Sequence, residues 1–151
     1  MEFLVLSIQG AESLLPLREP HAVVSIRTPG GPSARLVTGP ATLGVLYVAF
    51  PDLGRDYMNL PESEKTYLDG EPIKLFDRKD AKVILDFFLK HRGAAEVFVF
   101  HCEGGLSRSP GVAAALCKVA GQDDSEWFRR KTPNGLVYAT MLEEAAERGL
   151  L

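Results

Sequence analysis

EVFVFHCEGGLSRSPGVAAALCKVA, residues 96–120, passes from an apolar run through a glycine-rich segment into an alanine-rich one. The short apolar run at 96–100 predicts a buried strand, and the small residues at 110–120 predict a helix. Between them, Gly104 and Gly105 allow a tight turn in which successive backbone N–H groups point inward. A glycine-rich turn that leads into a helix N-terminus forms a site for an anion.

Cys102 and Arg108 stand on either side of this turn, with five residues between them. The inward amides and the positive end of the helix favour a thiolate at Cys102, which is the nucleophilic form of cysteine. The planar guanidinium of Arg108 can bind two oxygens of one phosphate at once. The same groups therefore predict both an activated nucleophile and a binding site for its target.

Outside this stretch, predicted strands alternate with predicted helices. Asp77 is a candidate N-cap, and apolar residues at helical spacing follow it, which predicts a helix at 78–91. The other predicted elements are strands at 3–8, 22–26 and 44–50, and helices at 11–17, around 127–128 and at 136–148. This alternation predicts an α/β fold with a central, mainly parallel sheet flanked by helices. Ligands bind such sheets beyond the carboxyl ends of the strands, where Cys102 is expected.

Length and composition limit the other options. The 151 residues suit one compact domain, predicted to cover 1–151. A formal net charge of -3 gives no general attraction to nucleic acid or to an anionic membrane. No apolar run is long enough to span a bilayer, and no secretory signal precedes the first strand. We therefore expect a monomer in the reducing cytoplasm, with Cys117 packed inside a helix rather than paired in a disulfide.

The segment 51–72 is the hardest to assign. It is polar, contains three prolines and is long for a connection. Long connections inside compact domains are usually functional or mobile.

A family resemblance follows from the motif around Cys102. His101-Cys102, five residues, Arg108 and Ser109 resemble the HC(x)5R(S/T) signature of the cysteine-dependent protein tyrosine phosphatase superfamily. HCEGGLSRS is most similar to the dual-specificity branch, including its small bacterial and phage-type members. KTPNGLVYATML (131–142) and FPDLG (50–54) resemble further segments of that branch. The resemblance covers about residues 22–148 and is strongest at 101–111.

The resemblance implies a role for each residue of the motif. Cys102 would be the nucleophile, Arg108 would clamp the transition state, and His101 would orient the loop. Ser109 would stabilise the departing thiolate, although capping of the helix is the alternative. Asn134 would brace the phosphate-binding loop, with an ordinary turn residue as its alternative. The loop residues that would bind phosphate are Glu103, Gly104, Gly105, Leu106, Ser107 and Arg108. Neither a metal ion nor any other cofactor is expected.

The general acid is less clearly marked. The mechanism that the resemblance implies needs a carboxylic acid to protonate the leaving oxygen. Asp52 follows a strand directly and is expected on the same sheet edge as Cys102, so we prefer it and treat 54–72 as an insertion. Asp69 is closer in sequence to the usual separation from the cysteine, and Asp56 also remains open.

The expected activity is hydrolysis of a phosphomonoester through a phosphocysteine intermediate. None of the variable loop positions is Lys or Arg, and Glu103 is acidic. Relatives that act on phosphoinositides or RNA ends usually carry basic residues there, so a phosphoprotein with phosphotyrosine or phosphoserine/threonine is the preferred substrate. A small phosphoester is the other expected partner, and the loop should also bind free phosphate or sulfate.

Three alternatives stay open at this stage. The chain could act on a non-protein phosphoester. It could also be a weak or inactive pseudophosphatase that binds phosphate without turnover. A rhodanese-like sulfur carrier would use a loop cysteine too, although it gives no reason for the His-Cys-(x)5-Arg-Ser set.

Overall fold

The computed structural model describes residues 1–65, 67–68 and 71–151 of the chain. The strands are β1 (Glu2–Leu6), β2 (His21–Arg27), β3 (Thr42–Ala49), β4 (Tyr67–Leu68), β5 (Glu71–Pro72) and β6 (Val97–His101). The helices are α1 (Ile8–Leu14), α2 (Arg55–Met58), α3 (Arg78–His91), α4 (Arg108–Val119), α5 (Ser125–Arg130) and α6 (Gly135–Glu147), with a 3₁₀ turn, η1, at Glu62–Glu64.

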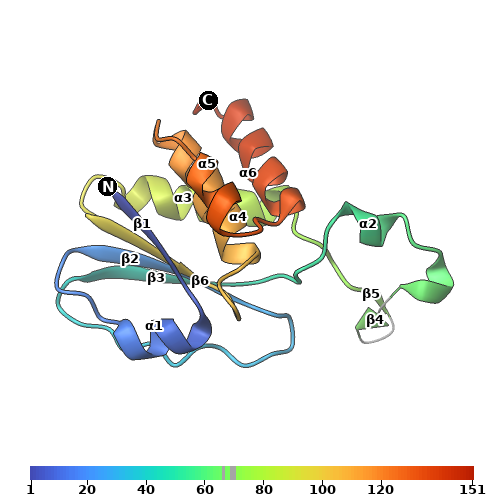
Figure 1. Cartoon of the computed structure of the whole chain (residues 1–151), viewed down its shortest axis with the longest axis horizontal. Coiled ribbons are helices and arrows are strands. Elements are labelled where there is room, and N and C mark those ends of the chain that lie inside the picture. The colour runs from blue at the N-terminus through green and yellow to red at the C-terminus, as the bar shows by residue number, and fades with distance from the viewer. Residues whose placement is uncertain (66, 69–70) are drawn as a thin grey trace.

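Four strands form one parallel sheet in the order β1-β6-β2-β3, and β4 and β5 form a separate antiparallel pair. The helices α3 to α6 lie on one face of the sheet, and α1 lies on the other (Figure 1). The predicted α/β fold with a parallel sheet flanked by helices is confirmed. Because all four strands run the same way, β6, β2 and β3 deliver their carboxyl ends to one edge of the sheet.

Alternating side chains of β6 divide the core between the two faces. Phe98 and Phe100 point into the larger cluster beneath α3, α4 and α6, and Val97 and Val99 into a smaller cluster with α1. All five residues of β6 are buried. Phe98 packs on Phe88 of α3 with ring centroids 4.9 Å apart. The strand that precedes Cys102 is therefore fixed on both sides, which restricts the position of the cysteine.

The first predicted elements are right in kind but displaced. The strand predicted at 3–8 ends at Leu6, and the helix predicted at 11–17 spans Ile8–Leu14. The reason is Ser7, whose Oγ accepts a hydrogen bond from the Gly10 backbone N at 3.0 Å and caps the helix. The strand prediction included this serine because it was based only on the apolar residues around it.

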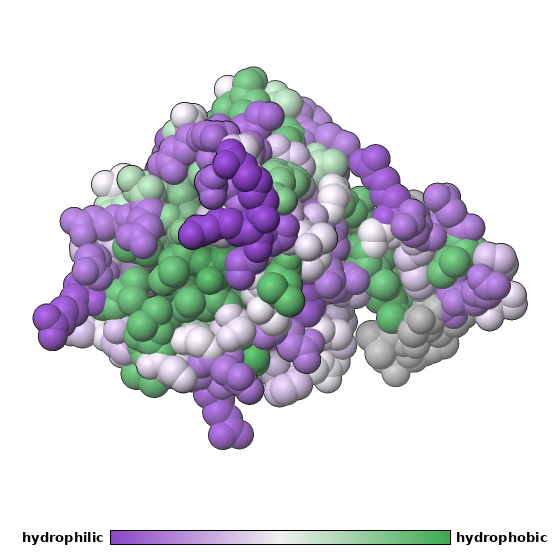
Figure 2. All heavy atoms as spheres, viewed as in Figure 1, coloured by the Kyte–Doolittle hydropathy of each residue, from purple (hydrophilic) through white to green (hydrophobic). Residues whose placement is uncertain are grey.

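The segment between β3 and α3 contains α2, η1 and the β4–β5 pair and projects away from the sheet and its helices (Figure 1). Hydrophilic side chains cover much of this segment and of the helical layer, whereas hydrophobic atoms gather around β1 (Figure 2). Each helix in the described part of the chain is too short or too polar to cross a membrane.

Candidate active site

The turn between β6 and α4 places Cys102 at the base of a cleft. Cys102 follows β6 directly and is only 3% exposed. Its Sγ lies 3.0 Å from Oγ of Ser109, in the first turn of α4. The cleft has a volume of about 310 Å³ and is lined by Asp52, Cys102, Glu103, Gly104, Leu106, Ser107 and Arg108. Five of these seven residues belong to the predicted phosphate-binding loop, residues 103–108.

The loop rests on the corner between β1 and α1. The backbone N of Ile8 donates to the Glu103 carbonyl at 3.0 Å. Gly105 has φ of +70°, and a Cβ there would lie 2.8 Å from both the carbonyl carbon and the carbonyl oxygen of Leu6. Backbone atoms cannot move away as a flexible side chain can. Only glycine fits at position 105.

We therefore expect Gly105→Ala to destabilise the fold by about 3 kcal/mol, since it combines a left-handed backbone with a backbone clash. Urea unfolding followed by circular dichroism measures this. Gly104→Ala is the matched control, because its Cβ would meet only the Leu106 side chain, at 3.8 Å. Equal unfolding midpoints for the two variants would contradict the described loop geometry.

Arg108 is held by groups that directly follow β2 and β3. Its side chain is 5% exposed, and Nη1 donates to Thr28 Oγ1 at 3.1 Å and to the Phe50 carbonyl at 3.0 Å. Nη2 lies 3.8 Å from the carboxylate of Glu103, which is itself 81% exposed. The guanidinium is thus anchored from behind, while its other terminal nitrogen faces the loop.

His101 lies behind the cysteine and is 1% exposed. Its Nδ1 is 3.0 Å from the Cys102 carbonyl, and its Nε2 is 2.6 Å from Ser25 Oγ. A carbonyl only accepts, so Nδ1 carries the proton and Nε2 accepts from the Ser25 hydroxyl. Burial lowers the pKa of His101, which keeps the ring neutral at pH 7. A neutral imidazole with both nitrogens bonded is suited to positioning the Cys102 carbonyl.

Asp52 follows the end of β3 and reaches the opposite rim of the cleft. Its Oδ1 accepts hydrogen bonds from Ser107 Oγ at 2.7 Å and from Asn134 Nδ2 at 3.0 Å. Asn134 Oδ1 in turn accepts from the Val137 backbone N and caps α6, and its backbone N donates to the Ser107 carbonyl at 2.9 Å. Asn134 therefore joins the loop between β6 and α4, the helix α6 and the segment of Asp52.

No family model and no curated protein matches this sequence. Solved structures do match. Human DUSP28 is 16% identical, with 99% of this chain and 95% of that chain covered and a TM-score of 0.58. The human tyrosine phosphatase-like serine/threonine/tyrosine-interacting protein is 14% identical, with 97% and 92% covered and a TM-score of 0.57. The chain has the tyrosine and dual-specificity phosphatase fold. A structure of PTPMT1 in complex with PI(5)P is also similar, at 14% identity and a TM-score of 0.50, with 97% and 91% covered.

Within this phosphatase fold, the other aspartates lie in different places. Asp77 is the N-cap of α3, as predicted, and its side chain accepts from the backbone N of Lys79 and Asp80. Asp56 lies in α2, and it is not among the residues that line the cleft. Asp69 lies outside the described residues. Cys117 is a buried free thiol whose pKa is raised by burial.

Three groups that the phosphatase fold brings to the site were not predicted from the sequence. Thr28 follows β2 and binds Arg108, so its position at a strand end was the signal that could have found it. Ser25 pairs with His101 in the register of β2 against β6, which only the strand order supplies. The Phe50 carbonyl is a backbone group, and no residue type marks it in the sequence.

Proposed function

We propose that this protein hydrolyses phosphomonoesters through a phosphocysteine intermediate, with phosphoproteins as its preferred substrates. One observation carries the proposal: the Cys102 thiol contacts Ser109 at 3.0 Å in the same cleft that Arg108 and Asp52 line. A nucleophile, a cation and a carboxyl group thus converge on one volume that a phosphate can occupy.

In the first step, the Cys102 thiolate attacks phosphorus and forms the S–P bond. The bond between phosphorus and the leaving oxygen breaks, and the Asp52 carboxyl gives that oxygen its proton. The loop amides and Arg108 bind the three equatorial oxygens, whose charge must be stabilised in the transition state. The anchoring of Nη1 by Thr28 and Phe50 lowers the reorganisation needed for this.

In the second step, the Asp52 carboxylate takes a proton from water as the water oxygen attacks phosphorus. The S–P bond breaks, and the Ser109 hydroxyl donates to the departing Cys102 thiolate. Inorganic phosphate then leaves, and Asp52 is protonated again for the next cycle. The contact between Sγ and Ser109 Oγ supports this role for the serine beside its place in the first turn of α4.

The charge at the cleft supports a substrate with a single phosphate. The loop positions around Arg108 carry no second cation, and the exposed Glu103 carboxylate lies 3.8 Å from Nη2. A second phosphate near Glu103 would be repelled. Singly phosphorylated tyrosine, serine or threonine side chains fit this charge better than a polyphosphorylated lipid head group.

The direct test is turnover of p-nitrophenyl phosphate and of phosphotyrosine and phosphoserine peptides by the wild-type protein. Release of phosphate from these substrates supports the proposal. Binding of the peptides without phosphate release would identify a pseudophosphatase. Sulfur transfer from thiosulfate without phosphate release would identify a rhodanese-like carrier and contradict the proposal.

The role of Asp52 gives a separate prediction. Asp52→Asn keeps an oxygen that can accept from Ser107 and Asn134 but cannot donate a titratable proton. We expect kcat/KM for phenyl phosphate, which reports the first chemical step, to fall on the order of 10²-fold. With an activated aryl leaving group, which departs without a proton, the loss of kcat/KM should be much smaller, and the basic limb of the kcat/KM profile should disappear.

Asp56→Asn is the matched control for that experiment, and Asp69→Asn tests the other open acid. Both variants should keep the basic limb and the wild-type dependence on the leaving group. Loss of the basic limb in one of them, with Asp52→Asn unchanged, would assign the acid to that residue instead.

A further inference from the structure

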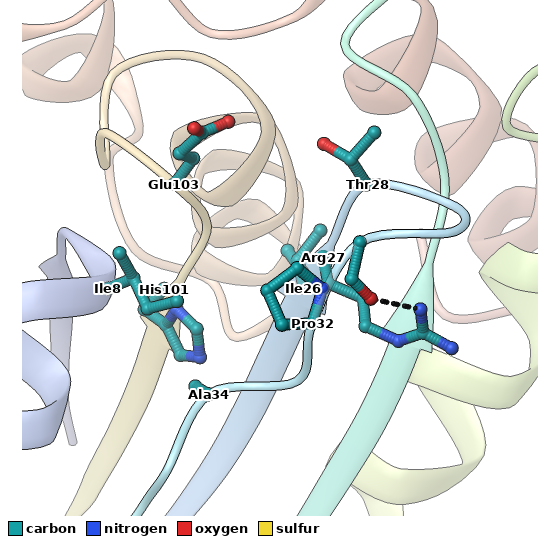
Figure 3. A pocket seen from close by; sticks show the side chains of 9 residues that line it. Ile8, Ile26, Arg27, Thr28, Pro32, Ala34, His101 and Glu103 are labelled. Atoms are coloured by element: carbon teal, nitrogen blue, oxygen red, sulfur yellow. Dashed lines mark hydrogen bonds between the residues drawn. The ribbon is translucent and has the colours of Figure 1, made fainter.

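A second pocket lies beside the cleft of Cys102. Its volume is about 150 Å³. The apolar part of its wall comes from Ile8 of α1, Ile26 of β2, and Pro32 and Ala34 of the connection after β2. Figure 3 shows Glu103 and Thr28 at one end of this pocket and Ala34 at the other, with His101 and Pro32 between them.

Two residues connect the wall of the pocket to the candidate active site. Glu103 lines both the pocket and the cleft. Thr28 lines the pocket and accepts the hydrogen bond from Arg108 Nη1. A group that enters the pocket therefore lies beside Glu103, the neighbour of Cys102 in the sequence, and beside Thr28, which is bonded to Arg108.

The wall of the pocket is held in place by hydrogen bonds. Arg27 Nη1 donates to the Gly31 carbonyl at 2.8 Å (Figure 3), and the Gly31 backbone N donates to the Thr28 carbonyl at 2.9 Å. Further along, the Arg35 backbone N donates to the Glu12 carboxylate of α1 at 2.6 Å. These bonds fix Pro32 and Ala34 before any ligand binds. The wall of the pocket therefore loses less conformational entropy when a ligand binds.

The chemistry of the pocket favours an apolar ligand. His101 contributes its ring, but Ser25 and the Cys102 carbonyl already bond both of its nitrogens. Of the remaining polar side chains, Thr28 and Glu103 lie at one end of the pocket (Figure 3), and Arg27 is bonded to the Gly31 carbonyl. An apolar cavity of about 150 Å³ in another protein accommodates benzene, so this volume suits a phenyl ring or a branched aliphatic side chain.

We propose that this pocket binds a leucine, isoleucine or phenylalanine side chain next to the phosphorylated residue of a peptide substrate. The inference rests on the proposed function and names its specificity. Only one loop residue, Glu103, lies between the pocket and the cleft in which the phosphate would bind. The side chain in the pocket must therefore belong to a residue that is close in the peptide sequence to the phosphorylated one. A residue that directly precedes or follows the phosphorylated one meets this requirement.

The experiment compares phosphotyrosine peptides that differ only in the residue before or after the phosphotyrosine, which is leucine in one peptide and alanine in the other. We expect kcat/KM to be roughly 10-fold higher for leucine at one of the two positions, the size of effect that a well-filled apolar pocket gives. The ratio of the two kcat/KM values is the readout, so changes common to both peptides cancel.

Two variants in the connection after β2 test whether this pocket is responsible. Ala34→Leu places extra carbon atoms in the pocket and should bring the leucine-to-alanine ratio to within about twofold of one. Ser33→Leu is the matched control, because Ser33 is exposed and does not line the pocket. It adds a side chain of the same size and should keep the wild-type ratio.

The outcomes separate the inference from the proposed function. Hydrolysis of both peptides with equal kcat/KM, or an unchanged ratio in Ala34→Leu, overturns the pocket and leaves the phosphatase activity standing. If no peptide is hydrolysed, the dissociation constants of the same two peptides are measured on the Cys102→Ser variant, and their ratio replaces the kcat/KM ratio as the readout. A roughly 10-fold ratio that Ala34→Leu removes supports the pocket, and equal constants overturn it.

Discussion

Replacing Cys102 by serine should lower kcat for p-nitrophenyl phosphate on the order of 10⁵-fold, the scale of loss seen when a nucleophile is removed from a hydrolase. A serine hydroxyl stays protonated at neutral pH, and His101 is not placed to take its proton, because both ring nitrogens are bonded to Ser25 and to the Cys102 carbonyl. The loop amides and Arg108 remain, so the variant should still bind phosphate, as titration calorimetry would measure.

Cys117→Ser is the control for this prediction. Cys117 is a buried thiol of α4 with a raised pKa, and it contacts Gln122 and Asp123 rather than the cleft. Its serine variant should keep the wild-type kcat. A Cys102→Ser variant within tenfold of wild type would show that the thiol is not the nucleophile.

Arg108→Lys should lower kcat on the order of 10³-fold, at the upper end of the loss from removing one donor to a transition-state oxyanion. Lysine keeps the charge but loses the planar fork. It also cannot reproduce the arrangement in which Nη1 bonds Thr28 and the Phe50 carbonyl while Nη2 faces the loop. KM should change less than kcat, because the fork matters most as charge spreads over the equatorial oxygens.

Arg78→Lys provides the comparison. Arg78 begins α3 and pairs with Glu144 and Glu147 of α6, so this substitution also exchanges an ion-paired arginine. It should leave kcat near the wild-type value. An Arg108→Lys variant within threefold of wild type would remove Arg108 from the proposed chemistry.

Elements whose signals are local could be predicted from the sequence. The helix α3 spans Arg78–His91, the range predicted from the cap at Asp77 and the apolar spacing that follows it. The strand and helix on either side of the loop at 102–107 were also predicted, to within two residues at each end. In each case the residues that decide the structure lie within one turn or one strand of one another.

Structure that depends on distant partners was harder to predict. The β4–β5 pair and α2 are two to four residues long, too short for a periodic pattern to form. Asp52 lies 50 positions before Cys102 in the sequence, and the parallel-sheet rule was enough to bring it to the correct edge. The roles of Ser25 and the Phe50 carbonyl could be predicted only from the order of the strands in the sheet, which amino-acid composition does not determine.

The most direct test of the central claim is to trap the intermediate. Acid quenching during turnover of a phosphotyrosine peptide, followed by mass spectrometry of the digested protein, would locate any transferred phosphoryl group. A second trapping experiment uses Asp52→Asn with p-nitrophenyl phosphate, because the activated leaving group departs without a proton while hydrolysis of the intermediate is slowed. We expect one phosphoryl group on the peptide that contains Cys102, and none on the peptide that contains only Cys117. Turnover with no covalent phosphoryl adduct, or with the adduct on another residue, would contradict the proposed mechanism.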